Sequence, residues 1–378
     1  MWNVLRSAAY RIHQRYFTHA TLFEGTLGGS STSCRCLLAM PRDSLSETFL
    51  LGRIYGGSFR RIWRRRIWIP WLTRWARALP PDVDFCIASL PTRWDEVFAS
   101  RCMLKGPPLV CQEIDLEGDW PDFKKRLHRK KRELLNRFLT RSPYDSRVSR
   151  DLAEFDHFYH RMYVPHAERQ FEKEAKIDSY QRLRGVFERG FLLLLAEGGR
   201  DVAGSLCYVD GDRLVYHRGG VLDSSEEHVR NGAQAASYVA MFSQAKAMKL
   251  KRLDVGTSRA FFDDGVYRNK REWGASVRVG EDLERWWYLL NPGDSEPCAS
   301  FLQQNPLIVQ TPEGLMGHLM AGIPTEHPGA EVAEIRRHYG ARGLKGMLVS
   351  RRCGGSPLLI PFPAGEAEEG QAGAGASS

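Results

Sequence analysis

Residues with reactive side chains are concentrated between positions 254 and 273. Asp254 follows a short apolar run, Asp264 begins an Asp-Gly pair, and Lys270 comes three residues before Trp273. A carboxylate can orient an amine or accept its proton, and an ammonium can stabilise a developing oxyanion or hold a phosphate. Each residue also has a structural explanation: Asp254 as a loop cap, Asp264 as turn chemistry and Lys270 as a solvated lysine. The candidate catalytic residues of this stretch are Lys270, Asp254 and Asp264.

Tyr216 and His217 are adjacent in a strand-like run and add two more candidates. Because side chains alternate along a strand, one of them faces each side of a sheet. Either could act as an acid or donate a hydrogen bond to a leaving group, and the alternative is a structural histidine. The chain has no G-x-S-x-G motif and no cysteine with an evident local partner. The pattern is therefore consistent with a reaction in which a group passes directly from donor to acceptor, without a covalent intermediate on the protein.

The order of predicted elements between residues 191 and 290 is restrictive. Three strand-like runs joined by Gly- and Asp-containing turns predict an antiparallel meander, and a long helix, a short buried strand and two further strands follow. These elements span residues 191–197, 201–210, 213–220, 232–248, 253–255, 276–279 and 286–290. This order predicts an α/β (α+β) fold with a mixed, largely antiparallel sheet flanked by helices.

The stretch DVGTSR (254–259), followed by DGVYRNKREWG (264–274), resembles the signature of FemAB-like proteins. The predicted element order is also similar to the second half of the GNAT (N-acyltransferase) fold. The resemblance covers about residues 110–290. It implies an enzyme, a GNAT/FemAB-like N-acyltransferase, that passes an acyl or aminoacyl group from an activated donor to an amine. It also implies that Lys270 lies at the reaction channel.

The resemblance implies acyl-CoA or aminoacyl-tRNA as the co-substrate and no tightly bound cofactor. Arg230, Asn231 and Gly232 precede the predicted long helix, where an acetyl-CoA site carries a Q/R-x-x-G-x-G/A loop, and here the spacing differs. Ser258 and Arg259, at the end of the motif strand, complete the predicted donor-binding set. The choice between CoA and tRNA stays open at the level of sequence.

The predicted organisation has four parts. Residues 1–110 are interpreted as a reduced or divergent N-terminal GNAT-like subdomain, and residues 111–290 as the GNAT-like acyltransferase domain. Residues 291–363 form a C-terminal extension, in which 314–320 is predicted to be weakly helical. Residues 364–378 are rich in Gly, Ala and Glu, and we expect them to be disordered.

Positive charge is concentrated in two segments of a chain whose formal net charge is +9. Residues 59–79 hold seven arginines and four tryptophans, and a single helix predicted over 121–139 has a basic face at 124–132. Such surfaces attract phosphates. For 59–79 the alternatives are inward-packed tryptophans with solvated arginines, contact with an anionic membrane, or binding of RNA backbone. For the helix they are a solvated face or phosphate recognition.

The surroundings of the protein are predicted from weaker signals. Eight scattered cysteines and the lack of a signal or spanning segment predict a cytoplasmic protein, either free or peripheral at the inner face of the membrane. His157, His160 and His166 lack a completed ligand set, so no metal is predicted. The predicted partners are an amine acceptor on a lipid- or nucleotide-linked precursor of the cell envelope or of a polysaccharide, tRNA and an anionic membrane. The oligomeric state is undecided. The competing function is a non-catalytic RNA- or membrane-surface-binding protein on a GNAT scaffold.

Overall fold

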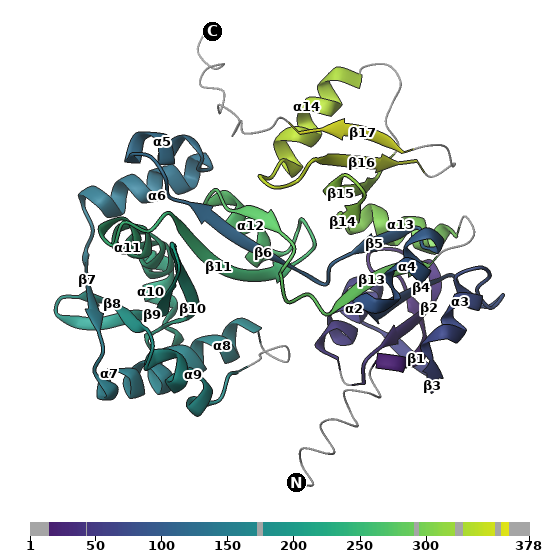
Figure 1. The fold of residues 1–378 in the computed structure, drawn as a ribbon, viewed down its shortest axis with the longest axis horizontal. Coiled ribbons are helices and arrows are strands. Elements are labelled where there is room, and N and C mark those ends of the chain that lie inside the picture. The colour runs from purple at the N-terminus through teal and green to yellow at the C-terminus, as the bar shows by residue number, and fades with distance from the viewer. Residues whose placement is uncertain are drawn as a thin grey trace. The chain divides into compact units, whose positions relative to one another are not determined.

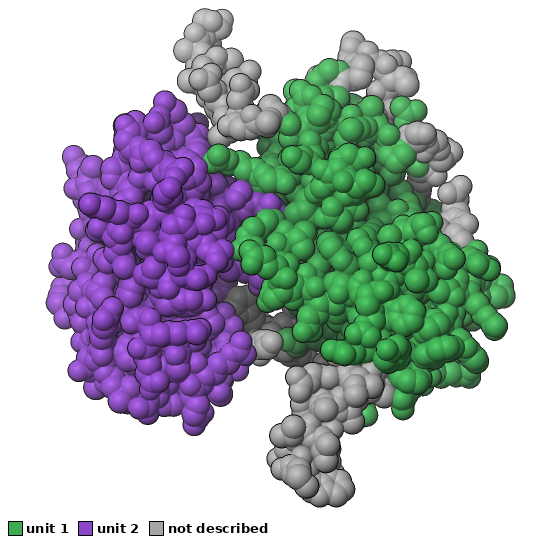
Figure 2. All heavy atoms as spheres, viewed as in Figure 1, with its two compact units in different colours: residues 1–110, 258–267, 278–364 green, residues 111–257, 268–277, 365–378 purple. Residues whose placement is uncertain are grey.

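The computed structural model describes residues 15–42, 44–171, 177–290, 295–321, 328–351 and 357–362. The chain divides into two compact units (Figure 2). Unit 1 comprises residues 1–110, 258–267 and 278–364, and unit 2 comprises residues 111–257, 268–277 and 365–378. The predicted disordered segment 364–378 lies outside the described residues. Each unit has hydrophobic clusters of its own.

Unit 1 contains a six-stranded sheet with the order β3-β1-β2-β4-β13-β5 (Figure 1). Its strands are β1 (Phe17–Thr26), β2 (Ser33–Met40), β3 (Phe59–Trp68), β4 (Phe85–Pro91), β5 (Leu104–Gly106) and β13 (Arg285–Leu290). Strand β3 forms one edge and pairs antiparallel with β1, and a bulge interrupts their register after Leu22. Strand β4 is central and buried along its whole length, as its apolar sequence requires.

Short helices cover the two faces of this sheet with separate hydrophobic clusters. Helix α2 (Leu45–Tyr55) is capped by Ser44, and it ends at Gly56, whose φ of 60° suits glycine. Its Leu50 packs in one cluster with strand residues. Helices α3 (Leu72–Trp75) and α4 (Asp95–Phe98) contribute to the other cluster.

A second sheet of unit 1 has the order β14-β15-β16-β17. Its strands are β14 (Leu307–Thr311), β15 (Gly314–Met320), β16 (Gly346–Ser350) and β17 (Leu358–Pro361), and helices α13 (Glu296–Gln304) and α14 (Pro328–Tyr339) belong to the same part of the chain. The weak helix predicted over 314–320 is wrong, because β15 pairs antiparallel with β14 and parallel with β16. The pairing with β16 joins segments that are far apart in sequence, so a local pattern cannot predict it.

Unit 2 is built on a seven-stranded sheet with the order β12-β6-β11-β10-β9-β8-β7 (Figure 1). Its strands are β6 (Leu109–Asp115), β7 (Tyr144–Ser149), β8 (Phe191–Glu197), β9 (Arg200–Asp210), β10 (Arg213–Val221), β11 (Arg252–Arg259) and β12 (Ser276–Arg278). Strands β8, β9 and β10 form the predicted antiparallel meander. The predicted α/β fold with a mixed, largely antiparallel sheet is therefore confirmed.

Helices flank the sheet of unit 2. They are α5 (Trp120–Lys125), α6 (Arg129–Thr140), α7 (Leu152–His157), a π-helix (Phe158–Tyr163), α8 (Val164–Phe171), α9 (Tyr180–Phe187), α10 (Glu226–Asn231), α11 (Ala233–Ala247) and α12 (Gly265–Glu272). The single helix predicted over 121–139 is wrong, because α5 ends at Lys125 and α6 begins at Arg129. No helix in the described part of the chain is long and apolar enough to cross a membrane.

Strands β10 and β11 pair over a short distance only. Their parallel register covers Arg213–Val215 and Arg252–Asp254, and both strands then continue without pairing each other. Both lie wholly within the described residues. Directly after the last pair with β11, a bulge between Tyr216 and Arg218 interrupts the pairing of β10 with β9. The two central strands therefore diverge along the second half of their length.

Candidate active site

Lys270 lies on α12 and points toward the diverging part of β11. The residue is only 5% exposed, and its Nζ donates a hydrogen bond to the carbonyl oxygen of Thr257 at 3.0 Å. A Cβ added to Gly256 would lie 4.0 Å from the same Nζ. The solvated-lysine explanation therefore does not fit, and the ammonium group is held at the point where β11 has left β10.

Asp254 shapes the backbone that receives this lysine. Its Oδ1 accepts a hydrogen bond from the amide of Gly256 at 2.7 Å, and Gly256 has a φ of 74°. A left-handed conformation of this kind favours glycine. Because Thr257 follows directly, the Asp254–Gly256 turn sets the direction of the carbonyl that binds Lys270. This contact gives Asp254 a positioning role.

Asp264 caps the helix that carries Lys270. Its Oδ1 accepts a hydrogen bond from the amide of Tyr267 at 2.8 Å, the pattern of an N-terminal helix cap. The observed contact of Asp264 is therefore a helix cap. The contact orients α12, and through α12 it orients Lys270.

Tyr216 and His217 lie at the bulge of β10. Burial raises the pKa of Tyr216, so its hydroxyl stays protonated and can donate a hydrogen bond. Burial, and then the neighbouring Arg218, lower the pKa of His217 to about 4, so its imidazole is neutral at physiological pH. The Nε2 atom of His217 makes no hydrogen bond within the described residues. His217 therefore offers an uncharged ring nitrogen at the bulge.

A half-buried amine beside Lys270 was missed by sequence reasoning. Lys131, on α6, donates a hydrogen bond to Asn269 Oδ1 at 2.6 Å, and its Nζ lies 5.3 Å from the ring centroid of Trp273. Burial lowers the pKa of Lys131 despite Glu272, whose Oε2 is 3.6 Å away. Within the basic face predicted at 124–132, no local feature distinguishes Lys131 from its neighbours, because its contacts, Asn269 and Trp273, lie far along the chain.

Aromatic rings connect this amine to the diverging strands. Tyr238, on α11, stacks on Trp273 with ring centroids 5.3 Å apart and planes at 7°. Its ring centroid lies 6.5 Å from that of Tyr216 on β10. Tyr238 also shares a hydrogen bond with Asn269. Tyr216, Tyr238 and Asn269 thus form a continuous path from the bulge of β10 to the residue before Lys270.

A buried carboxylate, also missed from the sequence, lies beside the bulge. The side chain of Asp178 is 2% exposed and pairs with Arg218 and with Arg182, the latter at 3.0 Å. Its backbone is held by two tyrosines of the π-helix: the amide donates to Tyr163 at 2.9 Å, and the carbonyl accepts from Tyr159 at 3.0 Å. π-helices occur often at functional sites. The local spacing of Asp178 and Arg182 resembles an ordinary surface ion pair, and the second partner, Arg218, lies far along the chain.

The predicted donor-binding residues occupy three different settings. Arg230 and Asn231 are exposed near the end of α10, and Gly232, with a φ of 96°, is the residue between α10 and α11. A Cβ at Gly232 would lie 2.9 Å from Phe138, so the close packing of this turn requires glycine. In unit 1, Ser258 is 4% exposed and Arg259 lies over the ring of Phe49, 4.4 Å from its centroid.

The histidines considered for metal binding have other contacts. His160 stacks with Tyr180, and His166 on α8 lies 2.9 Å from the side-chain nitrogen of Gln234 on α11. Across the described ranges, no group of three or more His, Cys, Asp or Glu residues could hold a metal ion.

The sequence profile of the acetyltransferase (GNAT) domain family matches residues 122–270. Unit 2 therefore carries a GNAT-type domain. The match covers less than half of the chain and contains β7 to β11, the bulge and Lys270. It supports acyl transfer in general, the coarser part of the predicted function. No curated protein sequence matches the chain.

Several solved structures are similar to the chain at low identity. The C-terminal domain of a putative lysylphosphatidylglycerol synthetase from Agrobacterium fabrum is 9% identical, with 75% of this chain and 83% of that chain covered and a TM-score of 0.35. FemX is 9% identical, with 72% and 85% covered and a TM-score of 0.36. L-PGS from Bacillus licheniformis is 12% identical, with 76% and 85% covered and a TM-score of 0.35. At these values the likeness carries no argument about substrate.

Proposed function

We propose that the GNAT-type domain is a FemAB-like N-acyltransferase that moves an acyl or aminoacyl group from an activated donor to an amine. The observation that carries the proposal is the position of Lys270. Its buried ammonium group is bound to Thr257, on the part of β11 that has separated from β10. The facing backbone edges of β10 and β11 suit an extended donor arm that carries amide groups, because such an arm can pair with a strand edge.

Direct transfer needs few reacting groups from the protein. The acceptor nitrogen attacks the acyl carbon, a C–N bond forms, and the carbonyl oxygen becomes an oxyanion that the Lys270 ammonium can stabilise. The C–S or C–O bond to the donor then breaks. The leaving thiolate or alkoxide takes up a proton, and the amine gives one up, so the step is balanced. Tyr216 can donate a hydrogen bond to the leaving group. Neutral His217 can accept a hydrogen bond from the amine, and the amine's proton passes to water.

The Lys270 role is tested by three variants of the full chain. We expect Lys270→Ala and the longer, uncharged Lys270→Met to lower kcat about 100-fold or more, because a preorganised charge at the oxyanion is lost. Lys270→Arg keeps the charge and should recover part of the rate. Lys249→Ala, which alters an exposed lysine of the same unit, is the matched control. Full activity in a folded Lys270→Met protein would remove Lys270 from the mechanism.

The donor can be identified without knowing the acceptor. A ligand that binds the native state raises the melting temperature, and the stabilisation grows with the logarithm of the ligand concentration divided by its Kd. Stabilisation by micromolar acetyl-CoA or a longer acyl-CoA would assign a CoA donor, and stabilisation only by aminoacyl-tRNA would assign the FemAB-like chemistry.

We propose that the acceptor amine belongs to a lipid- or nucleotide-linked precursor of the cell envelope, which the protein binds on the cytoplasmic side. The net charge of +9 supports an anionic acceptor of this kind.

A further inference from the structure

The segment 59–79 begins with an arginine-rich strand at the edge of a sheet. Strand β3 lies outside β1 in the order of the sheet, and ten residues form it (Figure 1). Five of them are arginines, and no Asp or Glu occurs between Thr48 and Pro81. An open hollow of about 700 Å³ lies against the strand. Its lining consists of His19, Arg42, Arg61, Arg64, Arg65 and Arg66.

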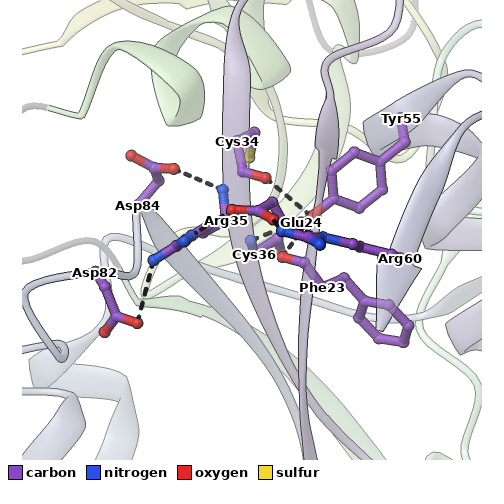
Figure 3. A network of polar contacts seen from close by, with 9 residues as sticks. All are labelled: Phe23, Glu24, Cys34, Arg35, Cys36, Tyr55, Arg60, Asp82 and Asp84. Atoms are coloured by element: carbon purple, nitrogen blue, oxygen red, sulfur yellow. Dashed lines mark hydrogen bonds and ion pairs between the residues drawn. The ribbon is translucent and has the colours of Figure 1, made fainter. Parts of the chain in front are cut away.

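Two of the strand arginines are engaged by carboxylates of the same unit. Glu24 on β1 binds Arg60 and also accepts a hydrogen bond from Arg35 at 2.7 Å (Figure 3). These two contacts hold the pKa of Glu24 below its usual value. Arg64 lies 3.3 Å from Glu47 on α2. Arg60 and Arg64 are therefore anchored to the sheet and to the helix that packs on it.

The other three arginines of the strand carry uncompensated charge. Arg61, Arg65 and Arg66 are exposed and make no ion pair with any described residue. Arg66 stacks over Phe17 and Arg65 over Trp63, which extends the guanidinium groups along the surface. We name Arg61, Arg65 and Arg66 the arginine surface. All its cations are arginines, whose planar groups bind phosphate through two hydrogen bonds.

Large apolar side chains lie exposed at both ends of the same strand. Phe59 and Ile62 are each 42% exposed, Trp68 is 48% exposed and Trp71, just beyond the strand, is 59% exposed. Charges on an edge strand normally prevent pairing with another chain. That explanation accounts for the arginines but not for exposed indoles, which promote association. Arginines bordered by exposed tryptophans are instead typical of a surface that lies in the headgroup region of a membrane.

We propose that the arginine surface, with Trp68 and Trp71, binds the surface of an anionic phospholipid membrane. The guanidinium groups would contact lipid phosphates while the indole rings enter the headgroup layer. Single-stranded RNA fits less well, because stacked bases need neighbouring aromatic faces. The exposed Phe59 lies roughly 30 Å from Trp68 along the strand. Trp68 and Trp71 both follow Arg66, so no exposed ring lies between the arginines. This inference concerns unit 1 and does not depend on the proposed acyl transfer.

Vesicle co-sedimentation of the full chain tests this proposal. We expect binding to vesicles of phosphatidylcholine with 30–40% phosphatidylglycerol (roughly the anionic fraction that gives a strong surface potential) and little binding to pure phosphatidylcholine. The triple variant Arg61→Gln/Arg65→Gln/Arg66→Gln should weaken binding about tenfold or more. Trp68→Ser/Trp71→Ser should also weaken binding to the anionic vesicles. Its effect should persist at high salt, because insertion of the indole rings is not screened as the charge attraction is.

A matched control removes the same charge elsewhere. Arg141, Arg150 and Lys249 are exposed in unit 2, and their combined change to Gln lowers the net charge equally. Melting temperatures verify that every variant is folded. Equal weakening by the control triple would reduce the effect to net charge and overturn the proposal. Binding of poly(U) RNA that is lost in the arginine triple, without binding to anionic vesicles, would assign the surface to RNA instead.

Discussion

The polar side chains around Lys270 form hydrogen bonds mainly with backbone groups. Asp254 fixes the turn at Gly256, Asp264 caps α12, and Thr257 offers the carbonyl that binds the lysine. The sequence could predict which residue types gather here, because they are close along the chain. It could not predict that Lys270 is buried, since that depends on packing. It also gave no indication of Lys131, which reaches the motif from α6.

A substitution pair at Asp264 separates capping from catalysis. Asparagine caps helices as well as aspartate does, whereas alanine does not. We expect Asp264→Asn to keep both stability and kcat, and Asp264→Ala to lower the free energy of unfolding by about 1 kcal/mol. Chemical denaturation and steady-state rates measure the two effects. A large fall in kcat for Asp264→Asn, at unchanged stability, would show that the carboxylate itself takes part in the reaction.

At the scale of elements, local patterns predicted the meander of β8 to β10 and the long helix α11. They did not predict β3 as a strand, because its arginines conceal the alternation of Trp63 and Ile67 that pack on the core. They also joined α5 and α6 into one helix. The cap of α6 is His128, which accepts a hydrogen bond from Lys130 N at 3.4 Å. Histidine is not a typical capping residue, so the sequence does not predict a helix start there.

The second sheet of unit 1 contains a histidine that should make stability depend on pH. His318 on β15 is 0% exposed, and burial lowers its pKa to about 4. In the unfolded chain the pKa returns to about 6.5. The unfolded state therefore binds the proton more tightly between these values, and stability falls as pH drops from about 6.5 toward 4. The expected loss by pH 4.5 is roughly 2–3 kcal/mol.

Urea denaturation at pH 7 and pH 4.5 measures this loss. His318→Gln should abolish that share of the pH dependence, although it lowers stability at pH 7 by disturbing the contact with Ser350 at 2.9 Å. His338→Gln, at an exposed position, is the control and should leave the pH dependence intact. The same pH dependence in His318→Gln as in the unsubstituted protein would mean that His318 is accessible to protons in the folded state.

At the scale of the whole molecule, the two units are interleaved along the chain. Strand β13 joins the first sheet of unit 1 between β4 and β5, although it follows the whole of unit 2's central sequence. Residues 268–277 return to unit 2 and bring Trp273 into its core. Such pairings of distant segments depend on tertiary contacts. The periodicity of residues within a short stretch of sequence therefore cannot predict them.

Because the hydrophobic clusters are separate, each cluster should protect a different set of backbone amides from hydrogen exchange. Trp273 is 1% exposed and packs on Tyr238 and Phe242 of α11. Truncation of a buried aromatic to alanine costs about 3–5 kcal/mol. We therefore expect Trp273→Ala to lower the protection of amides from hydrogen exchange in α11 and in β8 to β11, whose side chains share its cluster. Phe98→Ala, at a fully buried site of unit 1, should instead lower protection in β4 and β13.

Hydrogen exchange followed by peptide mass spectrometry distinguishes these outcomes. Because α11 and the strands of unit 2 share one cluster with Trp273, their exchange rates should rise together in Trp273→Ala. The strands of unit 1 should retain the rates of the unsubstituted protein, since their side chains belong to other clusters. If either variant instead raised exchange evenly along the whole chain, the two units would unfold as one cooperative body. Lys270 would then depend on both cores.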